Sequence, residues 1–539
     1  MSTYKYFMSA ALLLVSMMMS AQQSRISGKV VDDEGQPLPG ASVLVKGTKT
    51  GANADADGNY SLTADASATL EFSFIGYETK TVQVNSRSII NVILPAEASF
   101  LNETVVIGYG VQKKVNLTGS VATTDFEQIA KSRPITTPAA ALSGMNAGVM
   151  VRQSSSTPGS EGVSIRVRGI GTLNDSAPLV IVDGFEGSLG NVNPDDIATI
   201  SVLKDAASCA IYGNRGANGV VLITTKNGGR QGKASSSITY SGQFAINTPA
   251  NKFRVVSDYA DYMEIMNESA ENIGNSPIFS QAMIDLWREK SKDPNGIADS
   301  GYPNYVAYPN TDWVDAMFNR NVYQKHNISA SGSSGNGTNY LISASYLDNP
   351  GIVDNMGYKR FQLRTNVSSW ITKWLEAGTR LWGYLGNRQL NDFSGASGFM
   401  SRAVPGIYPE YDGKFGWMEN PEQSSNSRNN LYFFNRIGGR EKTLYLNAAL
   451  FLNIKLPLDI KYHASFNYTR QTVDYMKWVN LGGAYSFSRG ENAYEYNNLA
   501  NQYTEQNNSN TGHWTFQTDF SYNHTFAKKH EVGAMVGFE

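Results

Sequence analysis

The sequence predicts a mainly β fold in three parts: a small amino-terminal β-sandwich, a mixed α/β domain, and the first part of a transmembrane antiparallel β-barrel. Three patterns along the chain predict these parts. Short alternating strands separated by turn residues fill residues 26–96, helix and strand patterns mix in residues 115–228, and long strands with two-residue periodicity fill residues 233–539. A chain of 539 residues has room for several domains, because one hydrophobic core rarely serves more than about 250 to 300 residues.

Residues 1–21 have the pattern of a secretory signal peptide. Lys5 precedes an apolar run from Phe7 to Met19, and Ala21 precedes the polar Gln22. We expect cleavage after Ala21 and export of the remaining chain. The apolar run is too short to cross a bilayer core of about 30 Å as a helix, so a membrane location would require a β-barrel.

The composition excludes several classes of function. Charged residues make up 17% of the chain and aromatic residues 11%, which suits interfaces and the aromatic girdles of barrels. The net charge is −2 and no long basic run occurs, so we expect no nucleic-acid partner. Cys209 is the only cysteine, so no internal disulfide and no multi-cysteine metal site are expected, and a small buried thiol is favoured. We also expect no metal and no cofactor.

Residues 26–96 predict a small β-sandwich. Its expected strands are residues 26–31, 41–45, 60–62, 70–74, 81–84 and 89–94. Asp55, Asp57 and Asp65 offer a calcium alternative, but Gly58 is fourth and Ala66 twelfth when counted from Asp55, so the EF-hand spacing fails and a hairpin turn is favoured.

Residues 102–111 form a linker with one β-branched stretch. Glu103 to Gly110 could add as a strand to the sheet edge of another protein, since main-chain hydrogen bonds need no particular side chains. A simple interdomain strand is the alternative, which composition alone does not exclude.

Residues 115–228 predict a compact α/β domain. A short helix is expected from Pro138, a helical segment over residues 204–212, and strands over residues 164–168, 178–182, 199–203 and 219–226. Gly169 and Gly171 suggest a phosphate-binding loop, but Asn174 stands where a third glycine belongs and no helix pattern follows. We therefore reject nucleotide binding.

Residues 233–539 predict barrel strands. The nine expected strands are residues 238–246, 326–332, 340–347, 360–367, 375–384, 443–454, 459–468, 514–522 and 531–538. Alternate residues from Leu444 to Ile454 are almost wholly aliphatic, as a bilayer demands of one strand face. Short connections between these strands alternate with long ones. The long connections are residues 247–325, 385–442 and 470–513. This alternation is typical of barrels with short periplasmic turns and long external loops. An odd number of strands predicts an incomplete barrel, so we expect either a natural protein that continues beyond Glu539 or a truncated gene product.

Several segments carry a family resemblance. Residues 28–30, 39–43, 57–60 and 75–77 resemble the carboxypeptidase-regulatory-like domain, a non-catalytic module. Residues 165–169, 178–184, 193–197, 202–207, 211–220 and 223–226 resemble the plug signature of the SusC/RagA class of TonB-dependent transporters. The plug-motif residues are Arg166, Arg168, Gly169, Asp183, Gly184, Lys204, Asp205, Tyr212, Gly213, Arg215, Asn218 and Gly219.

The segment before the plug resembles the TonB box of that class. Its TonB-binding residues would be Glu103, Thr104, Val105, Val106, Ile107, Gly108, Tyr109 and Gly110. The resemblance implies a 22-stranded outer-membrane barrel in contact with lipid, occluded by the plug and paired with a SusD-like surface lipoprotein. It also implies oligosaccharide or peptide cargo and energy from the TonB–ExbB–ExbD complex. Cys209 stands where the class usually has a small residue, which we expect to change packing only.

One predicted external loop is rich in aromatic residues. Tyr408, Tyr411, Trp417 and Tyr432, together with Phe415, Phe433 and Phe434, could stack on a sugar ring. Loop packing or contact with the lid protein would equally use such side chains.

Import of a large nutrient is the function that these patterns favour. A cell-surface adhesin or structural β-protein is the alternative, because it would share the signal peptide, the sandwich and the alternating strands, but not the plug signature. We do not expect an enzyme, since the five histidines show neither metal-ligand spacing nor a neighbouring serine-elbow motif.

Overall fold

The computed structural model describes most of the chain in two compact units. The described residues are 23–32, 35–48, 50–74, 77, 79–94, 104–107, 110–113, 121–126, 137–172, 175–228, 234–250, 254–335, 337–391, 403–423, 429–480, 482–495, 502–526 and 530–539. The predicted signal peptide, residues 1–21, lies outside them. The first unit holds the amino-terminal β-domain, and the second holds the plug and the long strands.

The amino-terminal domain contains two small sheets. One has the order β4-β1-β7 and the other β3-β2-β5-β6. The strands are β1 (Gln23–Val31), β2 (Ser42–Val45), β3 (Gly51–Asn53), β4 (Asn59–Asp65), β5 (Thr69–Ser73), β6 (Lys80–Gln83) and β7 (Val92–Ile93). Alternate residues of β4 and β5 are buried, and Leu70 and Phe72 lose all solvent exposure. The prediction of a small β-domain is thus confirmed, with β3 as an additional strand.

Local chemistry explains two of its features. A Cβ at Gly28 would lie 1.9 Å from the carbonyl oxygen of Ile90, so only glycine fits where β1 approaches that segment. The Asp55 carboxylate accepts hydrogen bonds from the backbone N–H groups of Asp57 and Asn59, and the Asn59 contact lowers the pKa of that carboxyl. Asp55 therefore closes a turn, as its spacing predicts.

The plug has a five-stranded sheet with the order β10-β15-β16-β13-β14 and a separate pair, β11 and β12. The strands are β10 (Val121–Asp125), β11 (Val149–Gln153), β12 (Val163–Val167), β13 (Leu179–Val182), β14 (Phe185–Glu186), β15 (Ile197–Leu203) and β16 (Val220–Thr225). The helical segments are α4 (Pro138–Ala141), η2 (Leu189–Asn191), η3 (Pro194–Asp196), α5 (Ala206–Cys209) and η4 (Ala210–Gly216). Near-continuous apolar runs in β15 and β16 match strands that are buried on both faces.

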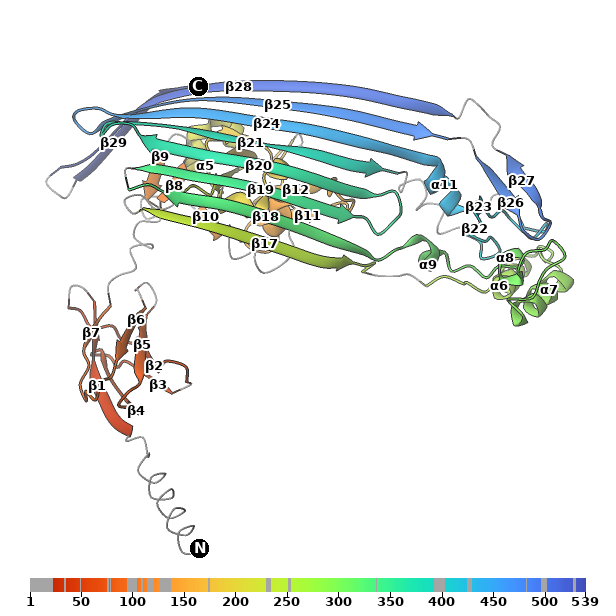
Figure 1. The fold of residues 1–539 in the computed structure, drawn as a ribbon, viewed down its shortest axis with the longest axis horizontal. Coiled ribbons are helices and arrows are strands. Elements are labelled where there is room, and N and C mark those ends of the chain that lie inside the picture. The colour runs from red at the N-terminus through yellow and green to blue at the C-terminus, as the bar shows by residue number, and fades with distance from the viewer. Residues whose placement is uncertain are drawn as a thin grey trace, which may run out of the picture. The chain divides into compact units, whose positions relative to one another are not determined.

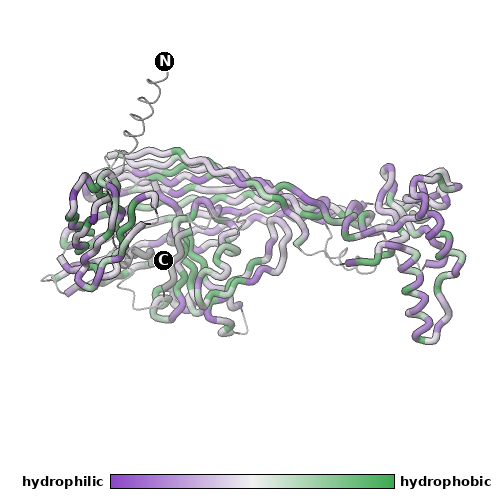
Figure 2. Tube along the Cα trace, turned by 90° about the horizontal axis from the view of Figure 1, so that it is seen from below, coloured by the Kyte–Doolittle hydropathy of each residue, from purple (hydrophilic) through white to green (hydrophobic). Residues whose placement is uncertain are grey.

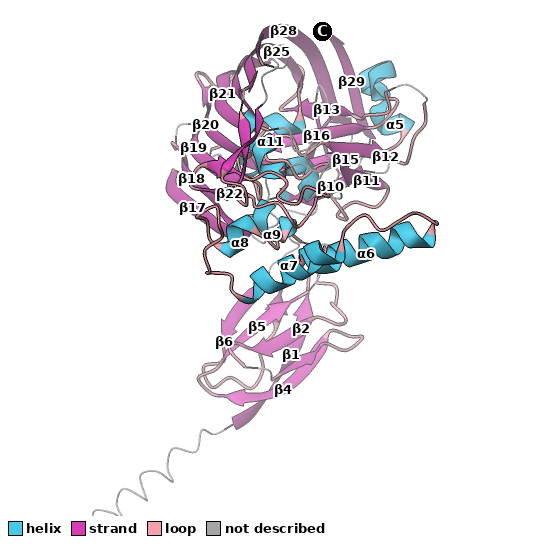
Figure 3. Ribbon diagram, turned by 90° about the vertical axis from the view of Figure 1, so that its right-hand side faces the viewer, coloured by secondary structure: helices cyan, strands magenta, loops and turns pink. Residues whose placement is uncertain are grey.

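Nine long strands form one antiparallel sheet, called here the wall. Their order is the order of the chain: β17 (Ser235–Asn247), β18 (Asn321–Ser333), β19 (Thr338–Pro350), β20 (Gly357–Trp370), β21 (Leu375–Leu390), β24 (Ile437–Lys455), β25 (Ile460–Val479), β28 (Tyr503–Phe526) and β29 (His530–Phe538). Figure 3 shows the wall as an arc with the plug strands on its concave side. All nine predicted strands are present in the described chain, and most extend beyond their predicted ends.

The long connections of the wall are folded. The first contains α6 (Tyr259–Asn272), α7 (Gln281–Lys292), α8 (Asn304–Ala307) and α9 (Trp313–Met317). The later ones contain β22 (Glu410–Tyr411), β23 (Lys414–Phe415), α11 (Asn430–Arg436), β26 (Gly483–Ser486) and β27 (Glu491–Glu495). Figure 1 shows these elements gathered at one end of the wall, and Figure 2 shows that hydrophilic residues predominate along the helices there.

This gathered region, called here the loop module, has its own core. Tyr259, Met263, Trp287, Trp313 and Phe434 are almost fully buried against one another. The sequence pattern predicts no helix or strand in these connections, and the structure shows that they contain both. No helix in the described part of the chain is long and apolar enough to cross a membrane.

Candidate functional site

The plug-motif residues mostly hold the plug in its own fold. Asp205 caps α5 by accepting a hydrogen bond from the Ser208 N–H, and the Lys204 ammonium donates to the Ala147 carbonyl at 2.6 Å. The Asn218 amide donates to the Asp175 carbonyl at 3.0 Å, and Arg215 pairs with Glu186. Each of these contacts joins residues distant in sequence or caps the start of a helix, so the motif residues stabilise the fold of the domain.

Several motif positions need a left-handed backbone. Arg168 and Gly169 follow β12 with φ of 57° and 97°, and Asp183 and Gly184 connect β13 to β14 with φ of 50° and 98°. Gly213 and Gly219 also have positive φ. Such values suit glycine, and an Asp-Gly pair suits a tight hairpin. Arg166 lies on β12, where its guanidinium donates to the Ile165 carbonyl, and Tyr212 packs beside Cys209.

Cys209 is a packed thiol. It is 4% exposed, and its sulfur contacts the Leu203 carbonyl at 3.7 Å. Burial raises the pKa of the thiol, so the neutral form dominates at neutral pH. Cys209 is thus buried in the plug, as expected from the sequence.

One buried polar cluster joins the plug to the wall. Arg364 of β20 has a fully buried side chain, and its Nε donates to Asp196 of the plug at 3.1 Å. Its Nη1 lies 3.6 Å from Asp183 and donates to the Thr225 hydroxyl at 3.2 Å. Asp183 in turn accepts hydrogen bonds from the N–H and hydroxyl of Thr225. Two plug carboxylates therefore share one wall guanidinium, and the side chains of Arg364 and Asp196 are almost fully buried.

Neighbouring wall residues complete this cluster. The Ser343 hydroxyl donates to Asp196 at 2.7 Å, and the Gln362 amide donates to the same carboxylate at 3.4 Å. The Asn366 amide donates to the Lys226 carbonyl at 2.8 Å. Gln362, Arg364 and Asn366 thus lie on one face of β20 and contact the plug, and they alternate with Phe361, Leu363, Thr365 and Val367 on the other face.

Further contacts lie on both sides of the cluster. Lys325 of β18 pairs with Asp195 at 2.8 Å, with both side chains largely buried. Arg360 donates to the carbonyls of Gly190 and Asn191 in η2, and its guanidinium lies 4.0 Å from the ring centroid of Tyr384. The wall residues Trp382, Tyr384 and Tyr445 also belong to the hydrophobic core of the plug. The plug is therefore packed against the wall as well as hydrogen-bonded to it.

Sequence reasoning missed the wall half of this interface. Arg364, Gln362, Ser343 and Lys325 belong to no motif, and they occur in strands recognised only by their periodicity. The available signal was an arginine or lysine on the face opposite the aliphatic residues, which a lipid-facing position would not tolerate.

The four aromatic candidates for substrate contact have different environments. Tyr408 and Tyr411 are partly exposed and lie in an edge-to-face cluster with Tyr305, at centroid distances of 5.8 and 6.4 Å. Trp417 is partly buried, and its N–H backbone group donates to the Tyr485 carbonyl. Tyr432 is only 2% exposed, and its hydroxyl donates to the Gly482 carbonyl. Tyr432 therefore packs inside the loop module, and we do not retain it as a ligand contact.

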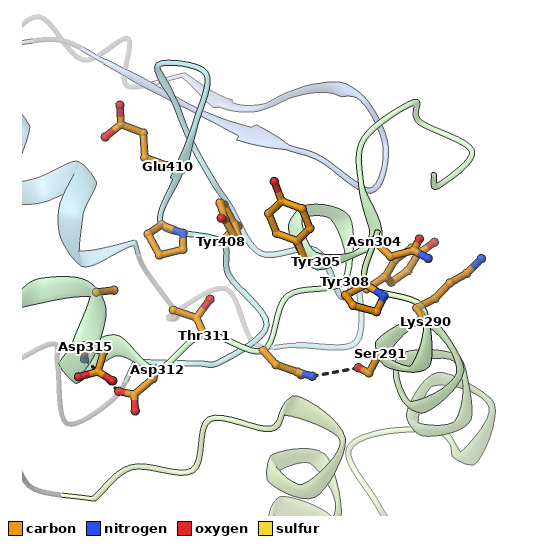
Figure 4. Close-up of a pocket in the computed structure, with 14 residues that line it drawn as sticks. Lys290, Ser291, Asn304, Tyr305, Tyr308, Thr311, Asp312, Asp315, Tyr408 and Glu410 are labelled. Carbon is orange, nitrogen blue, oxygen red and sulfur yellow. Dashed lines mark hydrogen bonds between the residues drawn. The ribbon is translucent and has the colours of Figure 1, made fainter. Parts of the chain in front are cut away.

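A pocket of about 460 Å³ opens in the loop module between α7, α8, α9 and the segment around Tyr408. Figure 4 shows tyrosine rings, amide groups and carboxylates around it. Tyr408 lines this pocket, whereas Tyr411, Trp417 and Tyr432 do not. The pocket mixes aromatic surface with hydrogen-bonding groups, which is the composition of a ligand site.

The predicted TonB-binding segment is described in part. Thr104 to Ile107 form β8, which pairs with β9 (Gly110–Lys113) in a two-stranded sheet. Glu103, Gly108 and Tyr109 lie outside the described residues. The extended conformation agrees with the strand prediction, and neither strand belongs to a larger sheet of the described chain.

Two family models match the chain. Residues 26–107 match the CarboxypepD_reg-like domain, and residues 113–220 match the TonB-dependent Receptor Plug Domain.

Individual proteins match over longer stretches. The TonB-dependent receptor SusC of Bacteroides thetaiotaomicron is 38% identical over 360 residues, which are 65% of this chain and 32% of that protein. The TonB-dependent receptor P39 of Formosa agariphila is 30% identical over 527 residues, or 96% of this chain and 46% of that protein. The RagAB peptide importer in its open-open state is similar in structure, with a TM-score of 0.63 at 26% identity over 80% of this chain and 48% of that one.

The chain thus spans between about a third and a half of the length of these relatives. The matched proteins are named as receptors and importers, in agreement with the prediction that the chain is not an enzyme.

Proposed function

Because the chain belongs to the SusC/RagA class of TonB-dependent receptors, we propose that it forms the plug-bearing part of a transporter that imports a large nutrient, an oligosaccharide or a peptide, across the outer membrane. The observation that carries this proposal is the plug itself, which is fixed to the inward face of the wall by the Arg364 cluster and by a shared core. An adhesin would have no use for a removable domain inside a barrel.

The contacts between plug and wall oppose the opening of a path for transport, because breaking them costs free energy. A path through the barrel requires some plug contacts to break, and those around Arg364 involve charges that water does not reach. Breaking a buried ion pair costs several kcal/mol. A pulling force on the plug would supply that energy, and we assign this role to the TonB–ExbB–ExbD complex.

The segment from Glu103 to Gly110 is the proposed handle. Part of it forms β8, and strand addition to a partner's sheet edge uses backbone groups that such a short strand can offer. On this proposal TonB binds the segment in the periplasm and pulls on the plug. A SusD-like surface lipoprotein would cover the external side, where Tyr408 and Tyr411 lie in the loop module.

The experiment uses the complete gene in cells that grow on defined glycans or peptides. One strain carries a replacement of residues 103–110 by a Gly-Ser segment of equal length, which preserves spacing and removes the strand. We expect loss of growth on one nutrient while surface binding of that nutrient persists. Replacement of the six residues 95–100 by the same kind of segment is the control, with growth retained. Unchanged growth on every nutrient after the first replacement would contradict import and favour the adhesin.

A further inference from the structure

The pocket in the loop module is rich in hydrogen-bond acceptors. Three carboxylates, those of Asp312, Asp315 and Glu410, line it together with one ammonium, that of Lys290. Figure 4 shows the carboxylates on one side of the pocket and Lys290 on the other. The formal charge of the lining is therefore negative, which opposes an anionic ligand.

The positive charge in the lining is already engaged. Lys290 lies in the last turn of α7, where an ammonium offsets the partial negative charge of the carboxyl end of a helix. Its Nζ also lies 5.7 Å from the ring centroid of Tyr308. Glu410, by contrast, is exposed at the start of β22. The side of the pocket that contains Glu410 thus keeps an acceptor for a ligand.

The lining also contains a buried hydrogen-bond acceptor, which likewise favours a ligand that donates hydrogen bonds. Asn304 is 5% exposed, and its Nδ2 donates to the Asp293 carbonyl at 2.8 Å. Its Oδ1 is buried and accepts no hydrogen bond from the described part of the chain. A buried polar atom without a partner is unfavourable, and a ligand with N–H or O–H groups would correct this.

The pocket is also lined by aromatic rings. Tyr305 is 39% exposed, and its ring meets that of Tyr408 at an angle of 63° with centroids 5.8 Å apart. The face of a tyrosine ring attracts cations through its quadrupole. Carboxylates, an orphaned carbonyl oxygen and exposed ring faces all favour a ligand that donates hydrogen bonds and carries positive charge.

We propose that this pocket binds a cationic group of the nutrient, a primary ammonium or a guanidinium. The identity of the pocket as a substrate subsite rests on the proposed import function, whereas its preference for cations is a separate property of its lining. Basic peptides and amino sugars both supply such groups, and the shared chemistry is an N–H donor with positive charge.

Binding to the purified complete transporter tests this preference without any dependence on TonB. The probes are a tripeptide of lysine, the disaccharide of glucosamine, and the N-acetylated form of each, in which size is similar and the charge is absent. We expect at least one amine to bind more tightly than its acetylated form, with binding weakened by added salt. Which amine binds distinguishes the peptide source from the sugar source.

Two variants locate the binding. Glu410→Gln removes a carboxylate with little change in shape, and we expect about three- to fivefold weaker binding of the amine. Tyr305→Leu removes an exposed ring, with about a two- to fivefold loss expected. Glu268→Gln removes the same charge from the exposed surface of α6, outside the pocket, and should leave binding unchanged.

Equal binding of amines and acetylated forms would overturn the proposal, as would Glu410→Gln behaving like Glu268→Gln. Either result leaves the import function intact, because that function is tested by growth after replacement of residues 103–110. Unchanged growth on every nutrient after that replacement, with the amine preference retained, would instead refute transport and keep the pocket.

Discussion

Arg364 is the residue on which the plug contacts converge. It supplies the one guanidinium that faces both Asp183 and Asp196 within the described cluster, and its side chain is fully buried. A buried charge that loses its partner cannot be hydrated. Removal of Arg364 would therefore leave the carboxylates of Asp183 and Asp196 without their partner, which is unfavourable. The bond network thereby couples a wall strand to two separate turns of the plug.

Replacing Arg364 with leucine should loosen the plug by about 3–5 kcal/mol, the usual cost of breaking a buried pair. We expect faster proteolysis of the plug in the purified complete protein under native conditions, since cleavage tracks local opening. Adding Asp196→Asn to the leucine variant should recover part of the loss, because one uncompensated charge disappears.

Arg489→Leu is the matched control for this measurement. Arg489 pairs with Glu491 in an exposed loop, with 42% of its side chain accessible, so its loss should cost less than about 1 kcal/mol. Equal protease sensitivity of the Arg364 and Arg489 variants would show that the buried cluster does not hold the plug.

Gly219 illustrates a different constraint at the residue scale. Its φ is +88°, and a Cβ there would lie 2.9 Å from the Cβ of Val167. Gly219→Ala should therefore destabilise the plug by at least about 1–2 kcal/mol, the cost of a left-handed backbone for an L-residue. Gly171→Ala is the control, because no atom lies within 4 Å of the added Cβ and φ is not positive. The same proteolysis assay compares them, and equal rates would contradict the steric argument.

Residue-level prediction from the sequence was uneven for physical reasons. The motif glycines and Asp183 were singled out by the resemblance to the plug signature, and the structure places several of them in turns with positive φ. Arg364 and Lys325 could not be singled out, because their importance comes from plug residues more than 100 positions away. The environment of Tyr432 was likewise set by packing against Gly482, which composition does not reveal.

At the scale of elements, the two-residue periodicity predicted strands correctly where one face of the strand is apolar along its length. Each of the nine wall strands has outward apolar residues, and a period of two marks such strands clearly. The helices of the long connections were missed although Tyr259, Met263 and Ala270 have the spacing of a buried helix face. Long polar connections were treated as loops, and their helices are stabilised by a core that only the assembled loop module provides.

Glu419 links two of the long connections in the loop module. Its carboxylate accepts hydrogen bonds from the N–H groups of Phe487 and Ser488 and from the hydroxyls of Ser486 and Ser488, at 2.7 to 2.9 Å. It is 3% exposed, and burial raises the pKa of this carboxyl despite the hydrogen bonds that favour its charged form. Residues after β23 are thereby held to the loop that follows β26.

This raised pKa predicts a pH dependence of the loop contact. A carboxyl whose pKa is higher in the folded state stabilises the fold most below its ordinary value of 4.5, and that contribution is lost as the pH rises through the raised pKa. We expect hydrogen-exchange protection of the Phe487 and Ser488 amides, corrected for intrinsic rates, to fall over that interval.

Glu419→Gln tests the assignment of this titration. The amide offers one acceptor oxygen in place of two, so we expect a loss of about 1–3 kcal/mol in local stability together with loss of the pH dependence. Glu491→Gln, at an exposed carboxylate of the same loop, should keep the pH dependence. A pH dependence that persists in Glu419→Gln would assign it to another group.

At the scale of the whole molecule, the two faces of the wall differ in the residues they carry and in what those residues contact. The inward face carries the polar residues that bind the plug, and the outward face carries exposed leucine, isoleucine and aromatic side chains. This division explains why one strand such as β20 combines a buried arginine with Phe361 and Leu363, which are 44% and 51% exposed. Water would make the outward face unfavourable, whereas the hydrocarbon of a bilayer would solvate it.

Leu446 on β24 tests whether lipid is that solvent. It is 48% exposed, while its neighbour Tyr445 is 6% exposed on the plug side. In the complete protein refolded into bilayers, Leu446→Arg should lower stability by about 2–4 kcal/mol, the cost of a cation at the bilayer midplane. Leu446→Ala separates the loss of side-chain size from the introduction of charge. If both variants were equally stable in bilayers, the outward face of β24 would not contact hydrocarbon, and the wall would need another partner to cover its apolar surface.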